Sequence, residues 1–77
     1  MNQLQRAFYL LTTRKMANFD FASHYILQYQ RVIHDLRNKY HFDVKMERTE
    51  NPKINMYYIP VPDGCFANID TMKFEEE

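Results

Sequence analysis

The sequence is short and electrically neutral: it has 77 residues, of which 45% are hydrophobic, 16% aromatic and 26% charged, and its formal net charge is zero. This balance is typical of a folded domain and excludes an intrinsically disordered chain. The length allows only one small core. A homodimer or a complex with a partner would stabilise such a core further. No stretch approaches the roughly 18 consecutive apolar residues of a transmembrane helix, so no membrane insertion is expected.

An apolar stripe near the amino terminus predicts a helix over about residues 2–13. Its inward positions have the spacing i, i+3, i+4 and i+7, and they are Leu4, Ala7, Phe8 and Leu11. Gln3, Gln5 and Arg6 then point outward. The stretch TTRKMANFD interrupts the stripe, and Asp20 stands where its carboxylate would accept hydrogen bonds from the first turn of a second helical segment.

Residues 21–40 have helical spacing that no glycine or proline interrupts. The apolar positions are Phe21, Ala22, Tyr25, Ile26, Tyr29, Ile33, Leu36 and Tyr40. Two arrangements satisfy this pattern: a single helix of about 20 residues, or two short helices joined by a tight turn near residues 25–27. The pattern alone favours the single helix, but both arrangements stay open.

After Tyr40 the apolar period changes from 3.6 to 2, which predicts a β-hairpin. Phe42, Val44 and Met46 form an apolar face and alternate with Asp43, Lys45 and Glu47. The stretch TENPK at 49–53 is a turn cluster, and a second β-prone run, INMYYI, ends at Pro60. The hairpin is therefore expected to turn at Asn51-Pro52.

The carboxyl-terminal part of the chain has a different charge from the rest. Residues 1–48 carry eight Lys and Arg against four acids, whereas residues 49–77 carry two Lys against six acids. The first part is therefore suited to face phosphates and the last is not. We expect residues 61–77 to form an acidic tail that is mobile or lies over the basic face and weakens binding there, with Phe66, Ile69 and Phe74 docked loosely.

Catalytic and metal-binding motifs are absent from the sequence. His24, His34, His41 and Cys65 do not have the spacing of a metal site, and the one glycine, Gly64, provides no phosphate-binding loop. We therefore expect a protein that is not an enzyme, with no metal, no cofactor and no small-molecule substrate. The single cysteine and the opening MNQLQRAFYLLTTRK, which lacks the long apolar region of a signal peptide, favour a reducing cytoplasm.

A helix, a helical pair and a hairpin follow one another in the order of a small winged helix. Residues 4–60 resemble the small helix-turn-helix domains common in bacteriophage genomes. The resemblance rests on the run IHDLR at 33–37, the alternating strand from Phe42 to Glu47, and the aromatic returning strand with MYY at 56–58. It implies an α+β fold with three helices in residues 2–40, a domain at 1–60 followed by the tail at 61–77, and a role in the cytoplasm of a bacterial host cell.

The same resemblance implies binding to double-stranded DNA, with the second helix of the pair in the major groove. If Ile26, Tyr29, Ile33, Leu36 and Tyr40 face the core, a 100° step places Gln28, Arg31, Asp35 and Asn38 on the opposite face, with His34 at its edge. Gln28 and Arg31 are then the expected base readers, beside Gln30. The expected phosphate contacts are Lys39, Lys45, Arg48 and Lys53.

Two classes of function follow from the sequence. The first is a DNA-binding regulator, such as a phage repressor or an excisionase-like factor. The second is a small phage protein that uses the same scaffold to inhibit or recruit a host protein, such as a defence protein or a transcription factor. Zero net charge and the acidic tail favour the second class, because DNA-binding domains of this size are usually basic.

Overall fold

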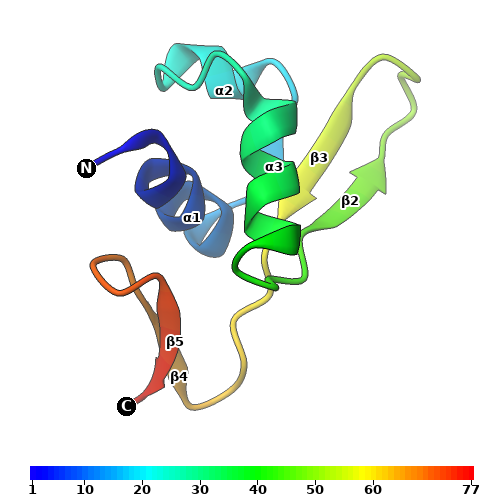
Figure 1. Cartoon of the computed structure of the whole chain (residues 1–77). Helices are drawn as coiled ribbons and strands as arrows, with labels where there is room; N and C mark the ends of the chain where they lie inside the picture. The colour runs from blue at the N-terminus through cyan, green and yellow to red at the C-terminus, as the bar shows by residue number, and fades with distance from the viewer.

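The computed structural model describes all 77 residues and has an α+β architecture, with helices packed on a three-stranded antiparallel sheet and a separate antiparallel hairpin (Figure 1). The elements in chain order are α1 Gln3–Thr13, β1 Met16–Ala17, α2 Asp20–Ser23, α3 Tyr29–Asn38, β2 Lys45–Arg48, β3 Asn55–Tyr58, β4 Cys65–Asn68 and β5 Lys73–Glu76. The larger sheet has the strand order β1-β3-β2, and β4 pairs with β5. No helix has both the length and the apolar character needed to cross a bilayer.

Helix α1 begins with a reciprocal cap and buries the predicted stripe. The Asn2 side chain accepts a hydrogen bond from the Gln5 backbone N–H at 2.8 Å, and the Gln5 side chain accepts one from the Asn2 N–H at 3.1 Å. Both bonds satisfy amides that a helix start leaves free. Ala7, Phe8 and Leu11 are buried as predicted, and Leu4 packs at the edge of the core.

Residues 20–40 form two helices joined by a tight turn, the second of the two arrangements that the sequence left open. The single helix favoured by the pattern is wrong, because α2 ends at Ser23 and α3 begins at Tyr29. The chain reverses at Tyr25, whose φ of 64° lies in the left-handed region. The Tyr25 N–H donates to the Ala22 carbonyl at 3.0 Å and the Ile26 N–H donates to the Phe21 carbonyl at 2.9 Å, which closes α2. This turn leaves Tyr25 78% exposed and buries Ile26.

The predicted capping role of Asp20 is also wrong. Asp20 is the first residue of α2, and its carboxylate accepts a hydrogen bond from the Ala17 backbone N–H at 3.2 Å, so it points back toward β1. The residue in the cap position is Phe19, which provides no side-chain hydrogen bond. Asp20 therefore joins α2 to the sheet instead of capping the helix.

The sheet contains one strand that the sequence did not predict and one that is shorter than predicted. Met16 and Ala17 form β1, which pairs with Tyr57 and Met56 of β3. Strand β2 covers only residues 45–48; Phe42 and Val44 are buried ahead of it, whereas Met46, expected on the buried face, is 43% exposed. The turn between β2 and β3 lies at the predicted place.

The segment predicted as a loosely docked acidic tail forms the β4–β5 hairpin. The Phe74 ring lies 5.8 Å from the Phe8 ring and 5.4 Å from the Phe42 ring, and Ile69 packs against the same core. The hairpin lies below α1, at the end of the molecule away from the β2–β3 turn (Figure 1). The expectation of a mobile segment or one that lies over the basic face is therefore wrong, and Phe66, expected to dock loosely, is exposed.

One core holds these elements together. Its 14 buried members come from α1, β1, α2, α3, the connections between the elements and the β4–β5 turn, and they include Phe8, Phe21, Ile33, Leu36 and Met72. Tyr40, which the helical pattern placed toward the core, follows α3 and is 39% exposed. The apolar side of α3 is thus provided by Val32, Ile33 and Leu36, and the opposite side faces solvent.

Candidate nucleic-acid interface

The outer face of α3 is polar and uncovered. Val32, Ile33 and Leu36 fix the inward direction of the helix, so residues half a turn away point outward. The exposed side chains of this outer face are Gln30, Arg31, His34, Arg37 and Asn38. No acidic residue lies in the first turn of α3, and the preceding Gln28 gives no side-chain cap. The amino-terminal end of α3 is therefore electrostatically suited to an anion.

Arg31 lies between two shallow hollows at the amino-terminal half of α3. One hollow of about 350 Å³ is lined by residues 27–31, and the other, of about 200 Å³, lies against Gln3 and Leu4 of α1. Asp35 lines the second hollow and is half-buried, so it points toward α1 and not directly away from the core as the helical wheel predicted. Arg31 has no ion-pair partner, which leaves its guanidinium free to bind a ligand.

His34 and Asn38 are held together on the outer face. The Asn38 side-chain amide donates to the His34 carbonyl at 2.9 Å and lies 3.2 Å from the His34 ring Nδ1. When Nδ1 accepts from Asn38, a neutral His34 ring carries its proton on Nε2. The pair therefore presents an N–H donor from His34 and the side-chain oxygen of Asn38 on the same stretch of helix.

The strand register separates the predicted phosphate contacts of the hairpin into two faces. Directly paired residues in an antiparallel sheet point to the same side, and Met46 pairs with Tyr57. The Tyr57 ring packs against the rings of Phe21 and Tyr29, which belong to α2 and α3. Arg48, two residues after Met46, therefore points to the helical side of the sheet, whereas Lys45 points to the opposite side.

The face that contains Lys45 is already neutralised by ion pairs. The Lys45 ammonium lies 3.1 Å from the Asp43 carboxylate, and Lys15 lies 2.9 Å from the Glu47 carboxylate and 5.1 Å from the centroid of the Tyr58 ring. The hydrogen bond with Glu47 and then its negative charge raise the pKa of Lys15 above its usual 10.5, and Asp43 raises the pKa of Lys45 in the same way. Both lysines therefore stay charged but are paired.

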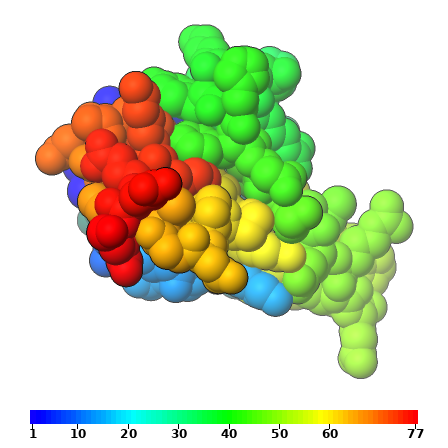
Figure 2. Space-filling view, turned by 90° about the horizontal axis from the view of Figure 1, so that it is seen from below, coloured from blue at the N-terminus to red at the C-terminus, as the bar shows by residue number.

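The tip of the β2–β3 hairpin carries the remaining predicted contacts. Arg48 and Lys53 are exposed and have no carboxylate partner, while Glu50 lies between them in the chain. The Thr49 hydroxyl donates toward the carbonyls of Asn51 and Ile54, at 2.9 and 2.8 Å, and shapes the turn. Figure 2 shows this hairpin projecting from the body of the molecule, away from the β4–β5 hairpin.

All nine residues predicted for DNA binding are exposed, and the structure brings three of them together at one hollow. They are Gln28, Gln30, Arg31, His34, Asn38, Lys39, Lys45, Arg48 and Lys53. Gln28, Gln30 and Arg31 share the hollow at the start of α3, and Arg48 faces the helical side of the sheet. Lys45 is the exception, because it lies on the opposite face of β2 and is paired with Asp43.

Two residues that shape this surface were missed in the sequence. Arg37 bonds through its guanidinium to the carbonyl of Val44, and Leu27 is 78% exposed directly ahead of α3. In the sequence Arg37 appeared only as part of the run IHDLR, with no role of its own. Leu27 had one available signal: it is a large apolar residue that does not fit the apolar spacing of residues 21–40.

Comparison with protein-family models, with curated proteins and with solved structures finds no match to this chain. No group of three or more His, Cys, Asp or Glu side chains is placed to hold a metal ion. What the chain does must therefore be inferred from the exposed face of α3 and the projecting hairpin.

Proposed function

We propose that this chain binds double-stranded DNA as a small winged-helix protein, in the role of a phage-type transcriptional regulator or excisionase-like factor. The support is the order of the elements: α1, β1, α2, α3 and the β2–β3 hairpin, with β1 paired to β3 in the sheet. In this arrangement α2 and α3 form the helix-turn-helix, α3 enters the major groove, and the hairpin contacts the backbone of the duplex.

The observation that carries the proposal is the uncovered polar face of α3. Helix α3 packs on the helical side of the sheet, and Arg48 of β2 points to that same side. Arg31 provides a free guanidinium fork that suits guanine O6 and N7, and the Gln28 and Gln30 amides suit adenine N6 and N7. Arg48, Lys53 and Lys39 provide cations for phosphates. Lys45 has no part in this interface, because it faces the other way and is paired with Asp43.

A second candidate function is binding to a host protein, which one feature of the surface favours. Three large apolar side chains around α2 are strongly exposed: Phe19 at 62%, Tyr25 at 78% and Leu27 at 78%. Exposed aromatic and aliphatic side chains beside an arginine are typical of the centre of a protein interface. The zero net charge of the chain is also compatible with a protein partner.

Fluorescence-anisotropy titrations with genomic DNA fragments across a salt series test the DNA proposal. Arg31→Ala should lose the preference among sequences, since it removes a contact directed at bases. Lys53→Ala should weaken binding to all sequences alike and reduce the salt slope by about 0.9, the share of one phosphate. Lys45→Ala is the matched control and should leave both properties close to those of the parent.

The two candidate functions give different results in this experiment. Binding of the parent weaker than about 10⁻⁴ M at near-physiological salt, the weak end of non-specific association, would rule out the DNA proposal. In that case a complex recovered from host lysate should survive nuclease treatment and be lost in Leu27→Ser, which leaves α3 and the hairpin charges intact.

A further inference from the structure

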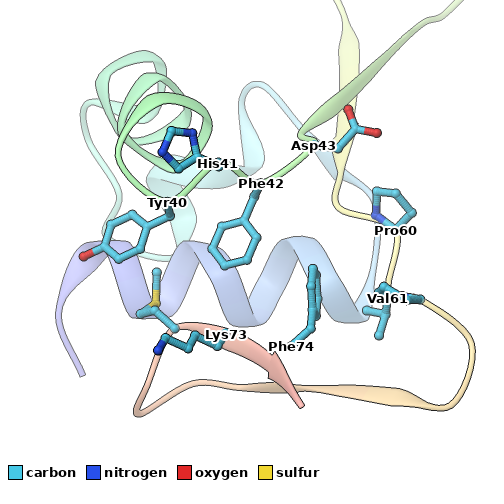
Figure 3. A pocket seen from close by; sticks show the side chains of 10 residues that line it. Tyr40, His41, Phe42, Asp43, Pro60, Val61, Lys73 and Phe74 are labelled. Carbon is cyan, nitrogen blue, oxygen red and sulfur yellow. The ribbon is translucent and has the colours of Figure 1, made fainter. Parts of the chain in front are cut away.

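An open cavity of about 650 Å³, no more enclosed than the hollows beside α3, lies on the side of the molecule where the α3–β2 connection meets the β4–β5 hairpin. Three separate parts of the chain line it: the connection with Tyr40 and Phe42, the segment after β3 with Val61, and the hairpin with Lys73 and Phe74. Figure 3 shows the rings of Phe42 and Phe74 turned into this space. Its volume is in the range of sites for small molecules, about 300–1,000 Å³.

The cavity presents aromatic surfaces in two orientations. The Tyr40 and Phe42 rings are stacked, with centroids 6.2 Å apart and planes 7° apart, whereas Phe74 meets Phe42 edge-on at 5.4 Å and 72°. Aromatic pairs favour offset stacking and edge-to-face contact. Tyr40 is 39% exposed, whereas Phe42 is only 9% exposed and its ring stacks on Phe8 with the centroids 4.5 Å apart. A flat aromatic ligand therefore contacts mainly Tyr40 and reaches Phe42 only over its small exposed part.

Lys73 is the charged side chain of the wall that has no counter-ion. It makes no ion pair and no side-chain hydrogen bond, while Asp43, the only acid in the wall, is bound to the Lys45 ammonium at 3.1 Å. His41 is also part of the wall and adds a donor or acceptor. An anionic group on the ligand therefore has a free partner in Lys73, whereas the only carboxylate in the wall is already paired.

We propose that this cavity binds a small aromatic carboxylate, with its ring against Tyr40, Phe42 and Phe74 and its carboxylate at Lys73. The site is separate from the proposed DNA interface, because none of the residues assigned to that interface lines the cavity. Only Asn38 and Lys39, at the end of α3, are close to it in the chain. Phe42 nevertheless connects the two regions, since its backbone N–H donates to the Leu36 carbonyl in the last turns of α3 at 3.0 Å.

The test compares two probes of the same shape by NMR titration of the full chain. Indole-3-acetate should shift the amide signals of residues 40–43, 61 and 72–74, and it should bind tighter than the neutral indole-3-acetamide by about two- to fivefold, the contribution of one exposed ion pair. Lys73→Gln should bring the two affinities together. The matched control Lys53→Gln, on the distant hairpin tip, should leave the preference intact.

Three results would overturn the proposal. They are the absence of shifts at the solubility limit of indole-3-acetate, shifts scattered outside the cavity, and equal affinity of the parent for the acid and the amide. Lys73 is exposed and unpaired, so the thermal unfolding of Lys73→Gln should match that of the parent and show that a lost preference is not a folding defect.

Discussion

Arg37 and the backbone of Val44 hold the end of α3 against the start of β2. The Arg37 Nη2 donates to the Val44 carbonyl at 2.7 Å and its Nε donates to the same oxygen at 3.2 Å. The two bonds close a connection of only six residues, from 39 to 44, in which His41 has a φ of 59°. Arg37 therefore fixes α3 relative to the β2–β3 hairpin, a role that nothing in the sequence pattern indicated.

Arg37→Met is expected to destabilise the protein by about 1–2 kcal/mol. The methionine keeps an apolar stem but removes both donors, and the Val44 carbonyl loses a charged partner. Denaturant unfolding of the variant measures the loss. Lys39→Met is the control, because Lys39 is exposed and its side chain makes no hydrogen bond, so its effect should stay within about 0.5 kcal/mol. Equal effects of the two substitutions would show that the Arg37 bonds contribute nothing.

Tyr25→Gly is expected to stabilise the protein by about 0.5–1 kcal/mol. A left-handed residue with a side chain costs about 1–2 kcal/mol, and glycine removes that strain while adding some entropy to the unfolded chain. The exposed ring gives up little packing, since Tyr25 is 78% exposed. The melting temperature should rise by about 2–8 °C.

A glycine inside a helix provides the comparison for this variant. Gln30→Gly in α3 should lower the free energy of unfolding by about 1 kcal/mol, because glycine is a poor helix former. If Tyr25→Gly also lowers the melting temperature, the Tyr25 ring contributes more to the folded state than its exposure indicates.

Phe74→Ala is expected to cost about 2–4 kcal/mol, whereas Phe66→Ala should stay within about 0.5 kcal/mol. Phe74 contacts the Phe8 and Phe42 rings, while Phe66 on the neighbouring strand is 42% exposed. Thermal unfolding of the two variants makes the comparison, and Phe74→Leu provides a milder variant if the alanine does not fold. Equal stability of both alanine variants would mean that the β4–β5 hairpin is not part of the core.

Parts of the fold were predictable where apolar periodicity and turn residues agree. Helix α1 follows from the spacing of Leu4 to Leu11, and the β2–β3 turn follows from the polar cluster at 49–53. The pattern allowed a break near residues 25–27 but could not decide between one helix and two, because Tyr25 takes a conformation that glycine usually marks. Strand β1 has only two residues and gains its pairing from β3, so no local signal reveals it.

The candidate interface was predictable in composition but not in geometry. Outward residues of α3 follow from the helical period, and the predicted ones are exposed except Asp35, which is half-buried against α1. The separation of Lys45 from Arg48 follows only from the register with β3 and from the packing of Tyr57, neither of which the sequence reveals. The β4–β5 hairpin was hidden because its three final acids dominated the charge pattern. Its contact with the core comes from separate apolar residues, Ile69, Met72 and Phe74, which show no clear period in the sequence.

If the chain binds DNA, Leu27 is expected to contact a thymine methyl group. Leu27 is 78% exposed and lines the same hollow as Gln28, Gln30 and Arg31 at the leading end of α3. The C5 methyl of thymine is the apolar group that the major groove presents, and covering it should contribute about 0.8 kcal/mol, or about fourfold in affinity. Replacing thymidine by deoxyuridine in the tightest-binding fragment removes only this methyl.

A double-mutant cycle between protein and DNA isolates that contact. The parent should bind the thymidine duplex about fourfold tighter than the deoxyuridine duplex, and Leu27→Ala should bind both equally, since the side chain that senses the methyl is gone. Met46→Ala, which removes another exposed apolar side chain, is the control and should keep the preference. A parent that binds DNA but does not distinguish the two duplexes would contradict the role of Leu27 alone, whereas a parent that binds neither duplex would contradict the DNA-binding proposal itself.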